Sequence, residues 1–161
     1  MELMMIEHVS IRLNLRNLRN GHSDSLSEFE DFVLKCHARI EDELVFPKLR
    51  ELFASAAEFS QQANYLSRLE ADHKLIEKIG QQLRIARLEN NNELLKKRSL
   101  LFANTLEIHN GSEESLVFPY WKYLEAHDSV QSRAKQIIEE FGMDRYFRAS
   151  GISDELLEQL N

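Results

Sequence analysis

Apolar residues spaced three and four positions apart predict a helix in the first twenty residues. The residues of this stripe are Met4, His8, Ile11, Leu15 and Leu18. Positions at these spacings lie on one side of an α-helix, the side that faces a protein core. The pair Asn20-Gly21 is a stop signal, so we expect the helix to end there. A histidine, His8, lies within the apolar stripe.

A second helix is predicted to begin near Ser25, because Ser25 and Glu28 have the spacing of a capping box. Its buried side is formed by Phe29, Val33, Cys36, Ile40 and Leu44. Pro47 should end or kink this helix, since proline lacks an amide hydrogen and clashes with the preceding turn.

Two further stripes predict a third and a fourth helix, separated by the polar break Asn90-Asn91-Asn92. We expect the third helix to begin near Ser55 or Ser60 and the fourth to reach towards Pro119. The third stripe is Leu66, Leu69, His73, Ile76, Gly80 and Leu83. The fourth is Leu94, Leu101, Phe102, Thr105, His109 and Leu116. Each of these stripes again contains a histidine.

After Pro119 the pattern predicts shorter elements. Residues 120–127 read as a short helical continuation, Asp128 and Gln131 can cap a helix that runs to about Phe141, and a last turn or two is expected after Ser153. With no long linker, the sequence predicts an all-α fold: an antiparallel, up-down four-helix bundle over residues 1–126, with a short helical extension over 127–161 packed on it. The alternative is that the extension binds another protein.

Composition narrows the function classes. Hydrophobic residues make up 43% of the chain and charged residues 29%, and no run approaches the roughly 20 apolar residues that span a bilayer. We therefore expect a soluble protein with no membrane contact, and a cytoplasmic one because the N-terminus lacks signal-peptide features. A net charge of -7 argues against nucleic acid as a partner. The single cysteine excludes an internal disulfide and a cysteine-rich zinc site.

Two segments repeat one motif. HARIEDELVFP begins at His37 and HNGSEESLVFP begins at His109; each has a glutamate four residues after the histidine, Glu41 and Glu113, and each ends in Leu-Val-Phe-Pro. Residues four apart on an α-helix face nearly the same direction, so each pair can chelate one cation. Imidazole and carboxylate ligands suit iron, manganese or zinc, and carboxylates on opposite helices can bridge two ions about 3.5–4 Å apart.

The histidines of the other two stripes, His8 and His73, complete the prediction of a metal site. A lone histidine on an apolar stripe is more often a packed, hydrogen-bonded residue than a ligand. Here one histidine occurs in each of four predicted helices, and buried ionisable groups are costly unless something compensates them. We therefore predict a dinuclear metal site in the centre of the bundle.

The order and spacing of these residues resemble the hemerythrin-like family, also called the HHE cation-binding domain, over residues 1–126. The resemblance rests on His8, on His73 within EADHKLIEK and on the two HxxxE motifs with their Phe-Pro endings. It implies a non-haem di-iron protein with two oxo- and carboxylate-bridged iron ions that binds or reacts with O2, peroxide or nitric oxide, or that senses or supplies iron. Manganese or zinc in place of iron is not excluded by the ligand types.

The sequence departs from the oxygen-carrying hemerythrins, which have HxxxH in the third helix and HxxxxD in the fourth. Here His73 is followed by Glu77, and His109 by Glu113 and Glu114. Glu77 is either an additional ligand or a solvated carboxylate, whereas Glu114 points about 100° away from Glu113 and is expected at the surface. More carboxylates favour the ferric state, so we do not predict an oxygen carrier.

The remaining residues of interest are His22, a loop candidate for a further ligand; His127, expected at the surface; and Cys36, expected to be packed rather than redox-active. The alternative function is a metal-dependent sensor or interaction module without turnover, in which the apolar tail after Gly142 binds a protein partner. A plain bundle with structural histidines would leave the repeated motif unexplained.

Overall fold

The computed structural model describes residues 2–20, 26–123 and 128–159, and every regular element in these ranges is a helix. The elements are α1 Glu2–Arg19, α2 Leu26–Phe32, α3 Ala38–Ile40, α4 Phe46–Ala54, α5 Ser60–Leu88, α6 Asn92–Leu116, α7 Asp128–Phe141, α8 Met143–Ser150 and α9 Asp154–Gln159, with π-helical segments at Val33–His37 and Glu41–Val45 and 3-10 turns at Ala57–Phe59 and Phe118–Tyr123. The predicted all-helical fold is confirmed for these residues.

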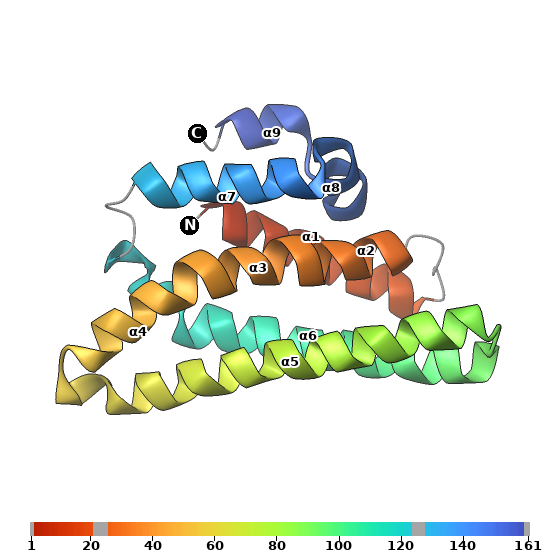
Figure 1. The fold of residues 1–161 in the computed structure, drawn as a ribbon, viewed down its shortest axis with the longest axis horizontal. Helices are drawn as coiled ribbons and strands as arrows, with labels where there is room; N and C mark the ends of the chain where they lie inside the picture. Colours follow the sequence, from red (N-terminus) through yellow and green to blue (C-terminus); the bar gives the residue numbers. More distant parts are fainter. Residues whose placement is uncertain (1, 21–25, 124–127, 160–161) are drawn as a thin grey trace.

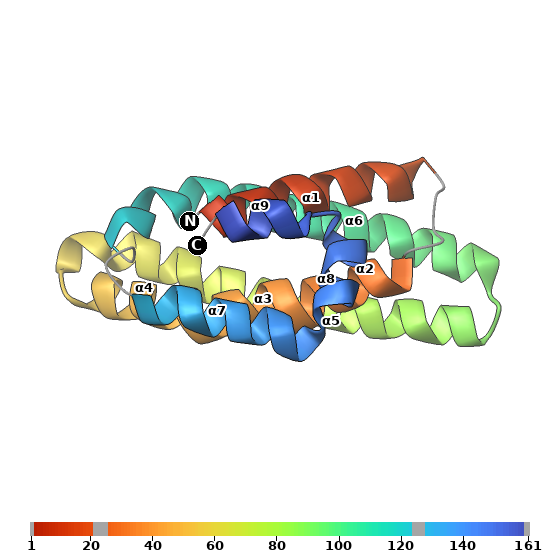
Figure 2. The ribbon, with the colours of Figure 1, turned by 90° about the horizontal axis from the view of Figure 1, so that it is seen from above.

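The helices form three layers (Figure 1). α5 and α6 pack along each other and form one outer layer, and α1 and the run from α2 to α4 form the middle layer. α1 lies against α6, while α4 lies against α5. The shorter helices α7, α8 and α9 cover the other side of the middle layer, with α7 along α3 and α8 between α1 and α2, as the view from above shows (Figure 2).

The second predicted helix is longer than expected, because helical structure continues from Leu26 to Ala54 through both π segments. Pro47 does not end it. The Phe46 amide hydrogen bonds to the Glu41 carbonyl five residues back, and Pro47 then falls in the first turn of α4, where a missing amide hydrogen costs little. The direction of the chain changes where α3 gives way to α4 (Figure 1).

The centre of this run is buried on nearly all sides. Cys36, His37, Ala38, Ile40 and Glu41 are all buried. One side faces α5, and α7 packs on α3 and on both π segments. A single three-and-four stripe therefore describes this segment poorly, since two layers cover it. π segments in helices often occur at functional sites, and here they flank the first HxxxE motif.

The remaining predictions of helix bounds agree with the structure in most places. α5 begins at Ser60, and the break before α6 lies at the asparagines, where Asn90 has a positive φ of 51° and the Asn91 side chain accepts a hydrogen bond from the Leu94 amide. The predicted start of the second helix at Ser25 lies outside the described residues. Gly80 allows α5 to lie close to Glu30 of α2: a Cβ there would lie 2.8 Å from Oε1 of Glu30, so the Glu30 side chain would have to move.

The C-terminal region contains one helix that the sequence analysis did not predict. α8 lies between Gly142 and Gly151, which have positive φ angles of 100° and 70°. Eight residues give barely two turns, too few for a periodic pattern to stand out. α7 ends at Phe141 and α9 follows Ser153, as predicted. Within the described residues, no helix combines the length and apolar character that crossing a bilayer requires.

Candidate metal centre

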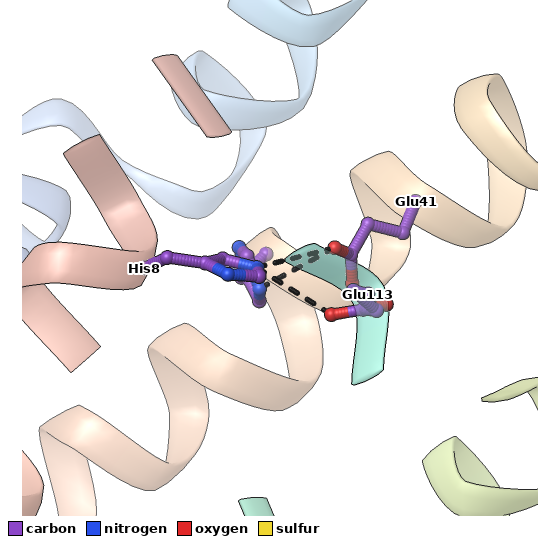
Figure 3. A group of neighbouring side chains, drawn as sticks. His8, Glu41 and Glu113 are labelled. Carbon is purple, nitrogen blue, oxygen red and sulfur yellow. Dashed lines mark ion pairs between the residues drawn. The ribbon is translucent and has the colours of Figure 1, made fainter. Parts of the chain in front are cut away.

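Four buried side chains from three parts of the chain meet in a first cluster. It consists of His8 on α1, His37 and Glu41 beside α3, and Glu113 on α6, with potential ligand atoms all within 4.8 Å of one another. Nε2 of His8 lies 3.7 Å from Oε1 of Glu41 and 3.4 Å from Oε2 of Glu113 (Figure 3). Nε2 of His37 lies 3.5 Å from Oε1 of Glu41.

A second cluster adjoins the first and uses the same two glutamates. It consists of His73 on α5 and His109 on α6 together with Glu41 and Glu113, again within 4.8 Å. Nε2 of His73 lies 3.3 Å from Oε2 of Glu41, and Nε2 of His109 lies 3.1 Å from Oε1 of Glu113. The two histidine nitrogens are 2.9 Å apart.

The two glutamates connect the clusters through different oxygens. Oε1 of Glu41 faces the first cluster and Oε2 the second, whereas Oε2 of Glu113 faces the first and Oε1 the second. A carboxylate that gives one oxygen to each of two neighbouring positions has the geometry of a bridging ligand. Each cluster therefore offers two imidazole nitrogens and two carboxylate oxygens.

The buried charged groups of the centre shift one another's pKa values. Burial lowers the pKa of His8, but the neighbouring carboxylates of Glu113 and Glu41 outweigh this and raise the pKa to about 10. Burial raises the pKa of Glu41, but the charge of His37 and the neighbouring imidazoles of His73 and His8 hold this pKa well below its usual range. Protons on the imidazoles balance the carboxylates here, and a cation would compete with those protons for the same nitrogens.

The residues fit a pair of metal ions. Buried atoms without a hydrogen-bond partner in the described part of the chain include Nε2 of His8, Nε2 of His37, Oε2 of Glu41 and both oxygens of Glu113. Buried polar atoms are rarely left unpaired, because each one costs about 1–3 kcal/mol. These atoms converge on two positions and are of the kinds that bind iron, manganese or zinc.

The outer nitrogens of three histidines meet carboxylates. Nδ1 of His37 lies 2.8 Å from Glu7, and Nδ1 of His8 lies 3.0 Å from Glu114. Nδ1 of His73 is 2.8 Å from Asp42. A carboxylate at Nδ1 fixes the tautomer that leaves Nε2 free for a metal, and it makes the imidazole a stronger ligand.

These carboxylates follow a repeat that the sequence analysis missed. An acidic residue precedes each of the two histidines outside the motifs, Glu7 before His8 and Asp72 before His73, and an acidic residue follows each motif glutamate, Asp42 and Glu114. Glu114 was expected at the surface; it is only partly exposed and contacts His8 and Arg12. The paired acidic positions were the signal in the sequence that could have revealed these contacts.

A family comparison agrees with this geometry. The model of the hemerythrin HHE cation binding domain matches residues 1–121. The chain belongs to the hemerythrin family. Comparisons with curated proteins and with solved structures gave no match.

Within this hemerythrin domain, the repeated Phe residues cover histidines of the opposite half of the chain. The ring of Phe46, in the first motif, stacks on His73 with centroids 5.2 Å apart. The ring of Phe118, in the second motif, lies on His8 at 4.9 Å. The structure thus places the Phe rings of the two Phe-Pro endings against His73 and His8.

Not every candidate ligand of the hemerythrin domain joins the clusters. Glu77 is exposed, and its Oε1 accepts a hydrogen bond from Gln81, so the structure does not bring it to the centre. His22 and His127 lie outside the described residues. Cys36 is a buried free cysteine, and burial raises the pKa of its thiol, which keeps the thiol protonated.

A small cavity of about 10 Å³ adjoins both clusters of the hemerythrin domain. His37, His73 and His109 form one part of its wall, and the apolar side chains of Val33, Leu34, Ala38, Ile76 and Leu106 form the rest. A cavity of this volume holds about one water-sized molecule. The centre therefore adjoins a small, mainly apolar space.

Proposed function

We propose that this chain is a non-haem di-iron protein that binds or reacts with O2, peroxide or nitric oxide. The observation that carries the proposal is the position of Glu41 and Glu113, each of which directs one oxygen to each of two histidine pairs. The hemerythrin family match supports iron as the metal. In this proposal, residues 1–126 form an antiparallel four-helix bundle around the centre, and residues 127–161 form an extension packed on it.

Two bound iron ions would supply adjacent Lewis-acidic, redox-active centres for a small molecule. The chain's own contribution is to hold and shield them. The four histidines present Nε2 from four elements, the carboxylates at Nδ1 orient three of the rings, and Phe46 and Phe118 exclude water from two rings.

The adjoining cavity favours small ligands. Its volume is about that of one water-sized molecule, which excludes large substrates, and its apolar wall suits an uncharged molecule such as O2 or nitric oxide better than a hydrated anion. Each metal position has only two imidazoles and shares two carboxylates, and Glu77 does not add a ligand. Such an anionic ligand set stabilises ferric iron, so we propose a reaction or sensing role in preference to reversible oxygen transport.

The test is to purify the untagged protein, measure its bound metals by mass spectrometry, and record its visible spectrum before and after anaerobic reduction and exposure to air. We expect roughly two irons per chain and a reducible oxo-bridge absorption. Absence of stoichiometric metal after anaerobic loading with ferrous ion would refute the proposal. Stoichiometric manganese or zinc would keep the dinuclear site but change the chemistry.

A second candidate is a metal-dependent sensor without turnover. A specific observation favours it: Tyr146 of the C-terminal extension contacts Glu7, which in turn contacts His37 in the first cluster. Metal binding could then change how firmly the extension is held. Limited proteolysis with and without ferrous ion tests this candidate, since equal cleavage rates after residue 142 would argue against it.

A further inference from the structure

A chain of buried hydrogen bonds leads from α8 to the metal centre. The Tyr146 hydroxyl donates to Oε1 of Glu7 over 2.7 Å, and Oε2 of Glu7 accepts from Nδ1 of His37 at 2.8 Å. Tyr146 and Glu7 are 0% exposed and His37 is 1% exposed. Water therefore does not compete for any of these contacts.

The contacts give each group one role. A carboxylate only accepts hydrogen bonds, and a tyrosine hydroxyl that faces it donates. Burial raises the pKa of Tyr146, which keeps its proton in place as the donor. Nδ1 of His37 must then carry a hydrogen, which leaves Nε2 as the nitrogen that a metal ion can bind. That atom lies 3.5 Å from Oε1 of Glu41.

The tyrosine is held in place by the docking of α8. Its ring packs edge-on against Phe32 with centroids 5.6 Å apart. The Ser10 hydroxyl of α1 donates to the Ser150 carbonyl at the end of α8. The link to His37 thus depends on a helix that lies beyond residues 1–121, the part of the chain matched by the family.

We propose that Tyr146 is a positioning residue of the metal centre: by holding Glu7, it fixes the orientation and tautomer of His37, so that the first cluster needs the C-terminal extension for full metal affinity. The inference rests on the proposed di-iron function. Loss of a carboxylate or similar partner that orients a metal-binding histidine weakens metal binding about 10- to 100-fold. Since Tyr146 acts one hydrogen bond further away, we expect the lower end of that range.

The experiment compares wild type with Tyr146→Phe, Glu7→Gln and the double variant. Each protein is loaded anaerobically with ⁵⁷Fe²⁺, and its irons are resolved by Mössbauer spectroscopy and titrated with a competing chelator. A His8→Ala variant assigns the signal of the first cluster. In Tyr146→Phe, which keeps the ring, we expect about tenfold weaker iron binding in the first cluster and an unchanged second cluster.

Glu7→Gln keeps the side-chain volume but removes the charge. It should weaken iron binding in the first cluster at least as much as Tyr146→Phe does. The double variant should bind iron no more weakly than Glu7→Gln alone, because Tyr146 acts on His37 only through Glu7. The control is Tyr65→Phe, which also removes a tyrosine hydroxyl, one whose partner is Gln61. It should bind iron like wild type.

The outcomes separate this inference from the proposed function. Wild type without iron would refute the di-iron centre itself. Two irons in wild type with both signals unchanged in Tyr146→Phe would overturn only the positioning role. Equal weakening of both irons with loss of helical content in the circular dichroism spectrum would also overturn it, because Tyr146 would then merely stabilise the fold.

Discussion

The two halves of the metal centre use the same sequence pattern but differ in how their histidines are supported. In the N-terminal half, Glu7 directly precedes His8, and its fully buried side chain lies 2.8 Å from Nδ1 of His37. In the C-terminal half, Asp72 has the equivalent position, but it stays 3.7 Å from Nδ1 of His109 and its side chain is 41% exposed.

Side-chain length and tertiary cover explain the difference. Aspartate is one methylene shorter than glutamate, and Nδ1 of His109 has no hydrogen-bond partner among the described residues. Glu7 is also held by Tyr146 of α8, and α8 packs on α1 and α2. A repeated motif therefore need not give two equivalent metal positions, and we expect the first cluster to hold its metal more tightly.

The largest effect should come from the residues that both halves share. Replacing Glu41 or Glu113 by alanine removes an oxygen from each cluster, so we expect loss of nearly all bound iron from both, measured by mass spectrometry. Glu77→Ala is the matched control, since Glu77 is an exposed glutamate four residues after a candidate ligand. A full di-iron complement in either shared-residue variant would rule out bridging.

The difference between the two halves should show when the acidic residues that precede His8 and His73 are replaced. Glu7→Ala should weaken iron binding in the first cluster about 10- to 100-fold, whereas Asp72→Ala should change the second cluster less than about threefold. Glu7→Ala should also lower the free energy of unfolding by about 1–3 kcal/mol, because it leaves Tyr146 and His37 without a partner. Chelator competition and urea unfolding measure the two effects. Equal losses from both variants would contradict the asymmetry.

Alkaline pH should affect the two halves alike in the metal-free protein. His8 in one half and His73 in the other both have a pKa raised to about 10, because the neighbouring carboxylates outweigh the effect of burial. A raised histidine pKa stabilises the fold fully below the unfolded value of about 6.5, and this contribution is lost as pH rises through about 10. The melting temperature should therefore fall over this range. A melting temperature that rises from pH 7 to 10 would contradict the expected loss of stability.

The smallest expected effect is a gain in iron affinity at the second cluster. Asp72→Glu adds one methylene and should bring a carboxylate within hydrogen-bond reach of Nδ1 of His109, since the present gap is 3.7 Å. Iron binding in the second cluster should strengthen by up to about tenfold while the first cluster stays unchanged. Glu7→Asp is the reciprocal variant and should weaken iron binding in the first cluster. No change in either would show that side-chain length does not set the difference.

Local sequence patterns were sufficient to predict the four helices that carry the ligands and to identify the two HxxxE motifs. Helical periodicity is a local property, so it placed His8, His73 and His109 within apolar stripes, and the four-residue spacing placed Glu41 and Glu113 on the same helix sides as His37 and His109. The same local chemistry identified nitrogen and oxygen ligands for a cation. The structure brings all six of these residues into the two clusters.

The residues that surround those ligands depend on how the helices pack together. Glu114 lies about 100° around α6 from Glu113, so the helix pattern alone directs Glu114 away from the side that holds Glu113. Here α1 packs against α6 on that side, so Glu114 meets Nδ1 of His8. Glu77 shares a helix side with His73 by spacing, yet it remains exposed. The contact of Tyr146 with Glu7 joins residues 139 positions apart. Periodicity shows only which way a residue faces on its own helix; which helix packs on that face depends on the whole chain.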